Sequence, residues 1–503
     1  MKKIILLSFF WPLLACKAEL PAKTESAVET KMSLNSVQSY DTTLVKVYNA
    51  PTGANLSTAY TVSVQGKPVP VYKVKVAPKD DASRWQAIDD RINTHLHFNT
   101  AAYAYFDMNG PVTVTVTMPS AVNTAKILPA NAGIAASISG NQVTFIVSQP
   151  KNLTVEINGE WVESLHLFAN PFETDVPSPT DPNVIYFGPG IHTVSKMTIG
   201  DNKTLYIAGG AILKAVVDPG ETSRDLGNGL RRYDPTFTVR GNNIKVRGRG
   251  IIDASECPNS ARNIFYNIAT TNFSMEGIIL QNASTWTMPI YYSQFVTIDN
   301  VKILGYRSGT DGIDICNSTR VNVKNCFVRT LDDLIVVKTQ EHPTYNKCAG
   351  IFVEKCVLWN QAAHALSVGA ELVKPVDDVT FTNCDVIHDQ GREWSLRVFH
   401  SDNALISNVR FDNIRIAEAN NFISLWINNA SWSTAATRGN IRNITFRNIT
   451  LTGLPRFKKI ELLGFDATHK IDTVLFNNVR LDNRAILNTD ITKNDFVYNL
   501  TLN

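Results

Sequence analysis

Residues 308–338 read SGTDGIDICNSTRVNVKNCFVRTLDDLIVVK, and they contain one copy of a pattern that returns along the chain. The copy is Val321-Asn-Val-Lys-Asn, in which apolar and polar residues alternate and an asparagine closes the run. Alternation of this kind is typical of a β-strand with one buried face. Further copies begin at Ile244, Phe273, Val296, Ile351, Val379, Val409, Ile444 and Val474.

Successive copies begin 23 to 35 residues apart, and no helical pattern separates them. A β-rich repeat of this length predicts a parallel β-helix, in which each coil stacks like residues on like. The asparagine suits the turn because it tolerates a left-handed backbone. A second antiparallel β domain and a β-propeller are the alternatives. The matched register disfavours the first and the short repeat disfavours the second.

Four aspartates flank the central copy, namely Asp311, Asp314, Asp332 and Asp333. Like charges close together disfavour ionisation, so an acidic cluster in an apolar, strand-rich stretch calls for a chemical reason. Turn formation is a sufficient reason for a single Asp-Gly pair such as Asp311-Gly312. Acids repeated at matching places of neighbouring coils favour chemistry instead.

In a β-helix these acids follow the turns of successive coils, so we expect them on one external face, about 5 Å apart per coil. The next two coils bring His364 and then Arg397 to the corresponding place. Carboxyl groups with room for water are the equipment of inverting glycoside hydrolysis, in which one acid protonates the leaving oxygen and another activates water. The predicted site is therefore a groove of acids with one histidine and one arginine.

The part of the chain before the repeats predicts a separate all-β module over residues 39–165. Alternating runs punctuated by Gly, Pro and Asn indicate antiparallel strands packed as a β-sandwich, with Tyr103, Tyr105 and Phe106 in its core. A linker rich in Pro, Asp and Thr covers 171–183, and the β-helix is expected over 184–503. The alternating runs of the β-sandwich module are residues 44–48, 60–64, 112–116, 143–147 and 153–157.

The N-terminus predicts a targeting segment. Two lysines and a short apolar run over residues 1–16 are typical of a signal peptide. The run ends in Leu-Leu-Ala-Cys16, which resembles the lipobox of bacterial lipoproteins and so implies a lipidated Cys16. An ordinary secretory signal is the alternative. Residues 17–38 are polar and predict a flexible tether. We expect an exported protein, in the periplasm or at the cell surface, that meets the membrane only through this lipid.

Composition narrows the partners. The 503 residues carry a net charge of +3 and only 18% charged residues, which argues against nucleic-acid binding. Nothing beyond residue 20 is apolar enough to span a bilayer. The six other cysteines show neither C-x-x-C nor zinc-like spacing, so no metal and no other cofactor is predicted. Cys326, Cys356 and Cys384 share one repeat position and are expected as a buried stack rather than as disulfides.

Three motifs resemble the hallmarks of the polygalacturonase family of glycoside hydrolases. They are Thr310-Asp311-Gly312-Ile313-Asp314, Asp332-Asp333 and His364-Ala-Leu-Ser-Val-Gly. The resemblance covers roughly residues 184–495 and implies a right-handed parallel β-helix. It implies that Asp332 is the general acid, that Asp311 and Asp333 hold the attacking water, that His364 tunes the acids and that Arg397 holds a saccharide substrate. Asp314 and Lys338 are expected to contact that substrate as well. A β-sandwich before the helix is similar to the related dextranase and isopullulanase family.

The chain departs from the family motifs at three places. Gly309 replaces an Asn, alanines flank His364 in place of glycines, and Phe399 replaces the Lys of Arg-x-Lys. A structural role is the alternative for His364. In the family that Lys pairs with a uronate carboxylate, and Phe399 offers neither charge nor donor. We therefore expect an α-linked saccharide other than plain polygalacturonate, unless Lys338, Lys374 or Arg392 replaces the missing cation.

Two other function classes stay open at this stage. A polysaccharide lyase also uses a parallel β-helix, but it needs a basic Lys or Arg, and the acid triad favours hydrolysis. A non-catalytic carbohydrate-binding β-helix is the third class. Aromatic side chains that would either stack on sugar rings or fill the core are Trp286, Tyr291, Tyr292 and Trp394.

Overall fold

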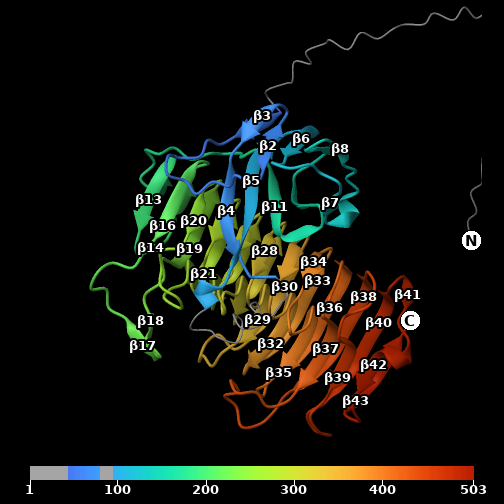
Figure 1. Cartoon of the computed structure of the whole chain (residues 1–503). Helices are drawn as coiled ribbons and strands as arrows, with labels where there is room; N and C mark the ends of the chain where they lie inside the picture. The colour runs from blue at the N-terminus through green and yellow to red at the C-terminus, as the bar shows by residue number, and fades with distance from the viewer. Residues whose placement is uncertain (1–43, 80–93) are drawn as a thin grey trace, which may run out of the picture. The chain divides into compact units, whose positions relative to one another are not determined.

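The computed structural model describes residues 44–79 and 94–503, which are almost entirely β-strand (Figure 1). The predicted signal peptide, the tether and Cys16 lie outside the described residues. The first strands and short helices are β1 (Val45–Val47), β2 (Thr61–Val64), β3 (Lys67–Val69), β4 (Val71–Val76), η1 (Thr94–Leu96), β5 (Asn99–Met108), β6 (Val112–Thr117), β7 (Ala125–Leu128), η2 (Ala130–Ala132), β8 (Ser137–Ser139), β9 (Gln142–Val147), β10 (Lys151–Ile157) and β11 (Glu160–Pro171).

Strands β1 to β11 form two sheets that face each other across one core. One sheet has the order β1-β5-β11-β10-β7 with β4 on β5, and the other has the order β3-β2-β6-β9-β8. Val114 and Phe145 from one sheet meet Phe106 and Val155 from the other in this core. The predicted alternating runs return as β1, β2, β6, β9 and β10. The first four have one face on the core and one face more exposed, whereas β10 is buried on both faces.

The expectation of purely antiparallel strands is wrong at the centre of the first sheet. Strand β11 runs parallel to β5, with Leu165 opposite Ala102. Strand β5 also lacks alternation, since Ala101 to Met108 are all buried. A strand that is buried on both faces loses the period of two, which is why no alternating pattern marked it.

Apart from β17 and β18, the remaining strands wind into coils that form one continuous sheet of 30 strands with three faces. We call the first the ladder face. It contains β12 (Val184–Phe187), β15 (Thr204–Ile207), β19 (Phe237–Gly248), β21 (Phe265–Glu276), β24 (Gln294–Asp299), β27 (Thr319–Lys324), β30 (Cys348–Glu354), β33 (Val376–Thr382), β36 (Leu405–Ile416), β38 (Asn440–Leu451), β40 (Ile471–Leu481) and β43 (Val497–Leu502).

The second face, here called the covered face, lies against the β-sandwich. It contains β13 (Gly190–Val194), β16 (Ala211–Ala215), β20 (Ile251–Asp253), β22 (Ile279–Gln281), β25 (Lys302–Leu304), β28 (Phe327–Thr330), β31 (Val357–Asn360) and β34 (Asp385–Asp389).

The third face, here called the site face, contains β14 (Met197–Ile199), β23 (Met288–Tyr291), β26 (Ile313–Cys316), β29 (Ile335–Thr339), β32 (Leu366–Leu372), β35 (Leu396–His400), β37 (Asn421–Ile427), β39 (Lys458–Leu463) and β42 (Ile491–Lys493). Outside the three faces lie the hairpin of β17 (Arg224–Gly227) and β18 (Leu230–Arg232), strand β41 (Arg484–Ala485) and η3 (Asn488–Asp490). The expected fold class, a β-sandwich followed by a right-handed parallel β-helix, is confirmed.

The ladder face carries the repeat that was read from the sequence. The first residues of all nine copies pair in register, from Ile244 opposite Phe273 to Ile444 opposite Val474. The closing asparagines adopt the predicted left-handed backbone, with φ of 54° at Asn325. The side-chain amide of Asn478 donates a hydrogen bond to Asn448 Oδ1 of the preceding coil at 2.9 Å. The pattern predicted both the register and the turn.

Like residues also stack inside the coils. The rings of Phe381, Phe411, Phe446 and Phe476 follow one another with centroids 4.9 to 5.0 Å apart. Cys326, Cys356 and Cys384 are buried and free, which confirms the predicted stack of thiols. In such ladders the same side chain occupies the same interior position in successive coils, so each coil packs well against the next.

The sandwich packs on the covered face through aromatic and apolar side chains. Tyr103 and Phe168 from the sandwich meet Phe327 and Trp359 from the coils. Tyr103 also donates its hydroxyl to Gln281 Oε1 at 2.8 Å. Tyr103, Tyr105 and Phe106 are buried as predicted. Phe106 lies between the two sheets of the sandwich, whereas the two tyrosines lie between the sandwich and the coils.

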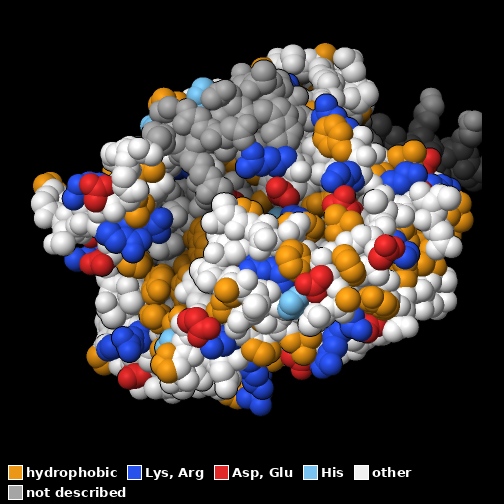
Figure 2. All heavy atoms as spheres, turned by 90° about the horizontal axis from the view of Figure 1, so that it is seen from below, with side chains coloured by type: hydrophobic (Ala, Val, Ile, Leu, Met, Phe, Trp, Pro, Cys, Tyr) orange, Lys and Arg blue, Asp and Glu red, His pale blue; other side chains and the backbone are white. Residues whose placement is uncertain are grey.

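Charges on the protein surface are mixed rather than separated. On the face seen in Figure 2, Lys and Arg side chains lie beside Asp and Glu. An example of such pairing is Arg415 with Asp385, whose Nε and Oδ1 atoms are 2.5 Å apart. Within residues 44–79 and 94–503, no helix is long and apolar enough to cross a membrane.

Candidate active site

The register of the site face lines up the predicted residues of three coils. The inward residues Ile313, Ile335 and Leu366 pair in succession. Two positions before each of them stand Asp311, Asp333 and His364. Their backbone carbonyls accept hydrogen bonds from the preceding coils. Thr287 N lies 2.8 Å from Asp311 O, Gly312 N lies 2.8 Å from Asp333 O, and Leu334 N lies 2.9 Å from His364 O.

Gly312 allows the two acidic turns to approach this closely. A Cβ atom at this position would lie 2.4 Å from the carbonyl oxygen of Leu334 on the next coil. The glycine is therefore explained by close backbone approach rather than by an unusual φ angle. It keeps Asp311 and Asp333 on adjacent rungs with no side chain between them.

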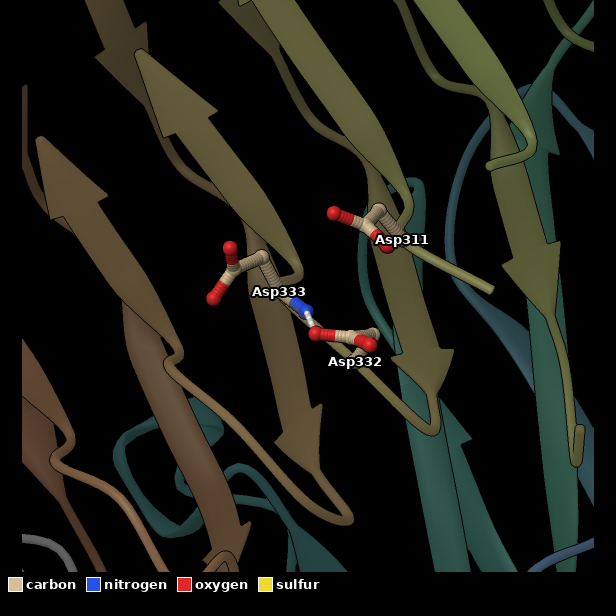
Figure 3. A group of neighbouring side chains, drawn as sticks. All are labelled: Asp311, Asp332 and Asp333. Atoms are coloured by element: carbon tan, nitrogen blue, oxygen red, sulfur yellow. Dashed lines mark hydrogen bonds between the residues drawn. The ribbon is translucent and has the colours of Figure 1, made fainter. Parts of the chain in front are cut away.

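The three predicted catalytic aspartates meet at one point (Figure 3). One carboxylate oxygen from each of Asp311, Asp332 and Asp333 lies within 4.8 Å of the other two. Asp332 Oδ1 accepts a hydrogen bond from the Asp333 backbone N–H at 3.0 Å. Asp311 and Asp333 are buried, whereas Asp332 is half-buried. Asp332 is the member of the trio with the most access to solvent.

A chain of hydrogen bonds runs from the acids to Glu393. His364 Nδ1 lies 2.6 Å from Asp333 Oδ1, and its Nε2 lies 3.1 Å from Arg397 Nη1. A guanidinium can only donate, so His364 Nε2 is the acceptor and Nδ1–H donates to Asp333. Arg397 also donates to Glu393 Oε2 at 2.7 Å. The arginine thus fixes the tautomer in which His364 Nδ1 carries the proton and donates it in a hydrogen bond to Asp333.

The acids differ in their electrostatic environment. Burial, with Asp314 adding to it, raises the pKa of Asp311 well above its ordinary value. Burial also raises the pKa of Asp314, to about 6. Burial acts in the same direction on Asp333, but the His364 imidazole and the Lys338 ammonium lower the pKa of Asp333 below its ordinary value. Among Asp311, Asp314 and Asp333, the last is therefore the carboxyl group held most firmly as an anion.

Phe399 lies against the histidine and the arginine. Its ring centroid is 4.7 Å from that of His364, and the Arg397 guanidinium carbon lies 4.4 Å above the ring. A Cβ atom on Gly369 would come within 2.6 Å of Phe399 Cδ1, so only glycine leaves room for this ring. The aromatic ring is thus built into the site by its neighbours on two coils.

These residues line a cavity of about 550 Å³. Four aromatic side chains border it, namely Trp286, Phe399, Trp426 and Trp432. Its charged lining consists of five acids and three bases, so acidic groups predominate. They are Asp311, Asp332, Asp333, Glu371, Glu393, Lys338, Arg392 and Arg397. Except for Asp314 and the undescribed Cys16, the predicted site residues all line this cavity.

Asp314 and Arg397 need correction. The Asp314 side chain has no exposed surface and lies 3.1 Å from Lys338 Nζ, so it cannot contact a substrate in this arrangement. Arg397 does not occupy the place that corresponds to His364. Leu366 pairs with Leu396, which puts Trp394 in that column and Arg397 three residues further along. The long arginine side chain reaches back to His364, which the spacing alone could not predict.

Of the aromatic residues predicted either to stack on sugar rings or to fill the core, some line the cavity and others are buried. Trp286 lines the cavity, whereas Trp394 is buried away from it and Tyr291 is also buried. Trp426 and Trp432 were missed. Trp426 pairs in register with Phe399, so an alignment of the last coils could have found it. Trp432 lies in the loop between β37 and β38, where the repeat gives no register.

The acid trio is also the one group of three acidic, histidine or cysteine side chains in the described ranges with atoms close enough for a metal ion. Lys338 already brings a positive charge to it, with Nζ at 3.0 Å from Asp311 Oδ2. We therefore treat the trio as acid–base groups rather than as metal ligands.

A parallel β-helix with clustered carboxyl groups in an aromatic-lined cavity defines the class of protein, a carbohydrate-cleaving hydrolase. The sequence model named "Glycosyl hydrolases family 28" matches residues 237–495, about half of the chain. The chain belongs to this family of glycoside hydrolases.

Relatives agree with this assignment, and solved structures share the fold. Over 290 residues the chain is 24% identical to "Endopolygalacturonase B" of Aspergillus oryzae, which covers 52% of this chain and 74% of the relative. Dex49A from Penicillium minioluteum shares the fold with a TM-score of 0.58 and 13% identity, covering 91% of this chain and 96% of that one. A hyperthermoactive exopolygalacturonase from Thermotoga maritima shares it with a TM-score of 0.51 and 16% identity, over 63% of this chain and 83% of that one.

Proposed function

We propose that the protein is an exported glycoside hydrolase that cleaves an α-linked, uncharged polysaccharide or oligosaccharide with inversion of the anomeric centre. Asp332 protonates the leaving oxygen, while Asp311 and Asp333 hold the water that attacks from the opposite side. The observation that carries the proposal is the meeting of three carboxyl groups, one half-buried and two buried, at the cavity wall. The accessible member is the one that has to reach the glycosidic oxygen.

The buried pair suits the binding of water better than covalent attack. Asp333 is hydrogen-bonded to His364, and Asp311 is hydrogen-bonded to Lys338. Carboxylates whose oxygens are already engaged by donors are poorer nucleophiles, but they can still orient a water molecule between them. His364 keeps Asp333 ionised, which lets Asp333 accept the proton that water loses.

Stereochemistry is the direct test of this mechanism. Most inverting pairs stand about 6.5–9.5 Å apart, a wider gap than the 4.8 Å within which the three oxygens lie. The inverting outcome therefore rests on the family membership and on the use of two carboxyls for one water. Proton NMR of freshly released product should show the anomer opposite to that of the substrate bond. A product of retained configuration would overturn the mechanism.

The charges in the cavity favour an uncharged substrate. Lys338 Nζ lies within 3.1 Å of both Asp311 and Asp314, and Arg397 is paired with Glu393 at 2.7 Å. Lys374 is paired with Glu341 at 2.6 Å. A uronate carboxylate that binds Lys338, Arg397 or Lys374 would have to displace the partner of that residue, and its own desolvation would then be poorly compensated.

The rest of the lining points in the same direction. With five acids and three bases in its lining, the cavity offers no excess of positive charge to a polyanion such as polygalacturonate. Trp286, Phe399, Trp426 and Trp432 offer flat apolar surfaces, against which the C–H face of a neutral sugar ring can stack. Phe399 stands where a family member carries a uronate-binding lysine.

The substrate is tested by reducing-sugar release from a panel of neutral α-linked glucans and galactosides and from de-esterified polygalacturonate. We expect the best neutral substrate to exceed polygalacturonate by at least about tenfold, since a hydrogen bond to a charged group contributes about 1.5–3 kcal/mol. Equal rates would refute the substrate assignment. The variant Phe399→Lys should gain activity on polygalacturonate, and Phe399→Leu, as a control for lost stacking, should not. Ultraviolet-absorbing unsaturated products would indicate a lyase instead.

Export and anchoring are part of the proposal but rest on the sequence alone. The predicted lipid would be attached to Cys16, and the variant Cys16→Ser should move the protein from the membrane fraction to the soluble fraction. If the serine variant stays in the membrane fraction, the lipid anchor is wrong.

A further inference from the structure

Lys338 is surrounded by carboxyl groups and covered by a tryptophan. Its Nζ atom lies 3.0 Å from Asp311 Oδ2, 3.1 Å from Asp314 Oδ1 and 3.6 Å from Asp333 Oδ2. The same atom lies 3.9 Å from the ring centroid of Trp286. Only 4% of the residue is exposed. An ammonium in this position is shared by three acids of two coils and has little surface left for a ligand.

The β-helix itself brings these groups together. Asp314 on β26 pairs with Val336 on β29, and Lys338 follows two residues later on the same outward side of the strand. Diagonal neighbours of this kind are within reach of a long side chain. Asp311 and Asp333 come from the turns just before the same two strands. The contact is therefore set by register and does not depend on a mobile loop.

We propose that Lys338 is a positioning residue, whose ammonium orients the carboxyl groups of Asp311 and Asp333 and opposes their protonation, and that it does not bind the substrate. This inference rests on the proposed function. It replaces the substrate contact that the sequence suggested for Lys338. It also gives Asp314 a role. Its buried carboxyl group lies beside the Lys338 ammonium and offsets part of the positive charge, although it does not reach the cavity.

Charge balance explains why the lysine is needed. Three buried carboxyl groups without a cation would be strongly destabilised as anions, and at least one of them would keep its proton. Burial opposes the charge of Lys338, but the surrounding carboxylates, with Asp311 foremost, raise the pKa of Lys338 well above its ordinary value. One positive charge facing three acids leaves Asp311 and Asp314 in competition for it. Asp333 is also held by His364.

The charged and titratable groups that face Lys338 all lie on the site face or in its turns. They are Asp311, Asp314 and Cys316 of one coil, Asp333 of its own coil, Glu371 of the next coil and Tyr291 of the preceding one. Cys316 and Tyr291 stay neutral, because burial raises the pKa of both well above the ordinary values. The acids therefore determine how the cluster titrates.

The test compares Lys338→Met, Asp314→Asn and the double variant with the natural protein, on whichever substrate the panel identifies. Lys338→Met should lower kcat by about 100-fold, within the range that one acid–base group contributes. It should also shift the acidic limb of the pH profile upward by at least about one unit and leave KM within about twofold. Adding Asp314→Asn removes the excess carboxyl group. The double variant should therefore have a kcat about tenfold higher than that of Lys338→Met, and the acidic limb of its pH profile should return toward that of the natural protein. A large rise in KM with an unmoved limb, or no recovery in the double variant, would overturn the inference.

A second measurement needs no substrate, so it separates this inference from the proposed function. A carboxyl group whose pKa is higher in the folded than in the unfolded protein makes stability fall as pH rises through the interval between the two values. Melting temperatures between pH 4 and 8 should therefore fall more steeply with pH in Lys338→Met than in the natural protein. Asp314→Asn should restore the slope in the double variant.

Lys338→Arg, which keeps the charge, guards against a general folding defect and should follow the natural curve. If the curves of Lys338→Met and the natural protein superimpose, the inference fails even if hydrolysis is found. If the slopes differ as expected and no saccharide is cleaved, the proposed function fails while the charge role of Lys338 stands.

Discussion

The ladder face and the site face are built from the same coils, yet they use the repeat in opposite ways. On the ladder side, one column of the interior reads Phe381, Phe411, Phe446 and Phe476, with stacked rings at each step. On the site face, the column two residues before each strand reads Asp311, Asp333, His364 and Trp394. One column repeats a single residue type, and the other changes from aspartate to histidine to tryptophan along the coils.

The difference separates folding from chemistry. A column of identical side chains packs equally well at each step, so it fixes the register and adds stability per coil. A column of different polar side chains does not stack as a ladder of like residues, and here it places two acids with oxygens within 4.8 Å and an imidazole that is hydrogen-bonded to one of them. The regular ladder supplies the rigid support that such a site requires. Substitutions on the two faces should therefore affect different properties.

The largest contrast is expected between two aspartates. Asp332→Asn on the site face removes the proton donor and should lower kcat by about 10²–10⁴-fold, with little change in melting temperature. Asp299→Asn on the ladder face is the matched control. Its carboxylate only accepts from Asn325 at 2.8 Å and pairs with Lys324, so activity should be unchanged. An active Asp332→Asn enzyme would remove Asp332 from the chemistry.

The reverse pattern is expected for the phenylalanine ladder. Phe446→Ala leaves a cavity between Phe411 and Phe476 and should reduce the free energy of unfolding by about 3–5 kcal/mol. Activity measured well below the melting temperature should be retained. Phe446→Leu, which fills more of the space, should be clearly less costly in urea-induced unfolding. Loss of activity in a still folded Phe446→Ala protein would mean that the two faces are not independent.

The difference between regular ladders and irregular positions also determines how much of the fold could be predicted from the sequence. The spacing of the copies gave the register of the ladder face and the left-handed turns at residues such as Asn325, because each coil repeats the requirement of the previous one. It could not give the parallel pairing of β5 with β11. Strand β5 is covered by the second sheet on one side and by the coils on the other, so its pattern carries no period.

The site residues that pair in register between coils could be predicted. Those whose positions depend on side-chain packing or on a loop could not. Asp311, Asp333 and His364 follow from the repeat. The burial of Asp314 depends on the long side chain of Lys338 and on Trp286 above it, and no spacing encodes that packing. Trp432 belongs to a loop outside the repeat, so its position in the cavity wall had no counterpart to align with.

A smaller effect than that of the acid is expected for the histidine. His364→Gln loses the short hydrogen bond to Asp333 and should lower kcat about 10- to 100-fold, which corresponds to the roughly 1.5–3 kcal/mol of a charge-assisted bond. His388→Gln is the control, because His388 is also bonded to two carboxylates, Glu156 and Glu418, but lies on the covered face. That variant should change stability and leave kcat alone. If both variants lose kcat equally, the histidine effect is structural.

The smallest effect concerns the turn asparagines, and it separates two contributions within the ladder itself. Asn413 has φ of 53°, and its side-chain amide lies 2.5 Å from Asn383 Oδ1. Asn413→Ala loses this bond and also puts a Cβ without polar compensation into the left-handed region, so unfolding should become easier by about 1–2 kcal/mol. Asn413→Gly loses the same bond but tolerates the backbone, and should cost less than Ala by about 1 kcal/mol. If urea titration gives equal costs for Ala and Gly, the side-chain ladder rather than the turn conformation is what selects asparagine at this position.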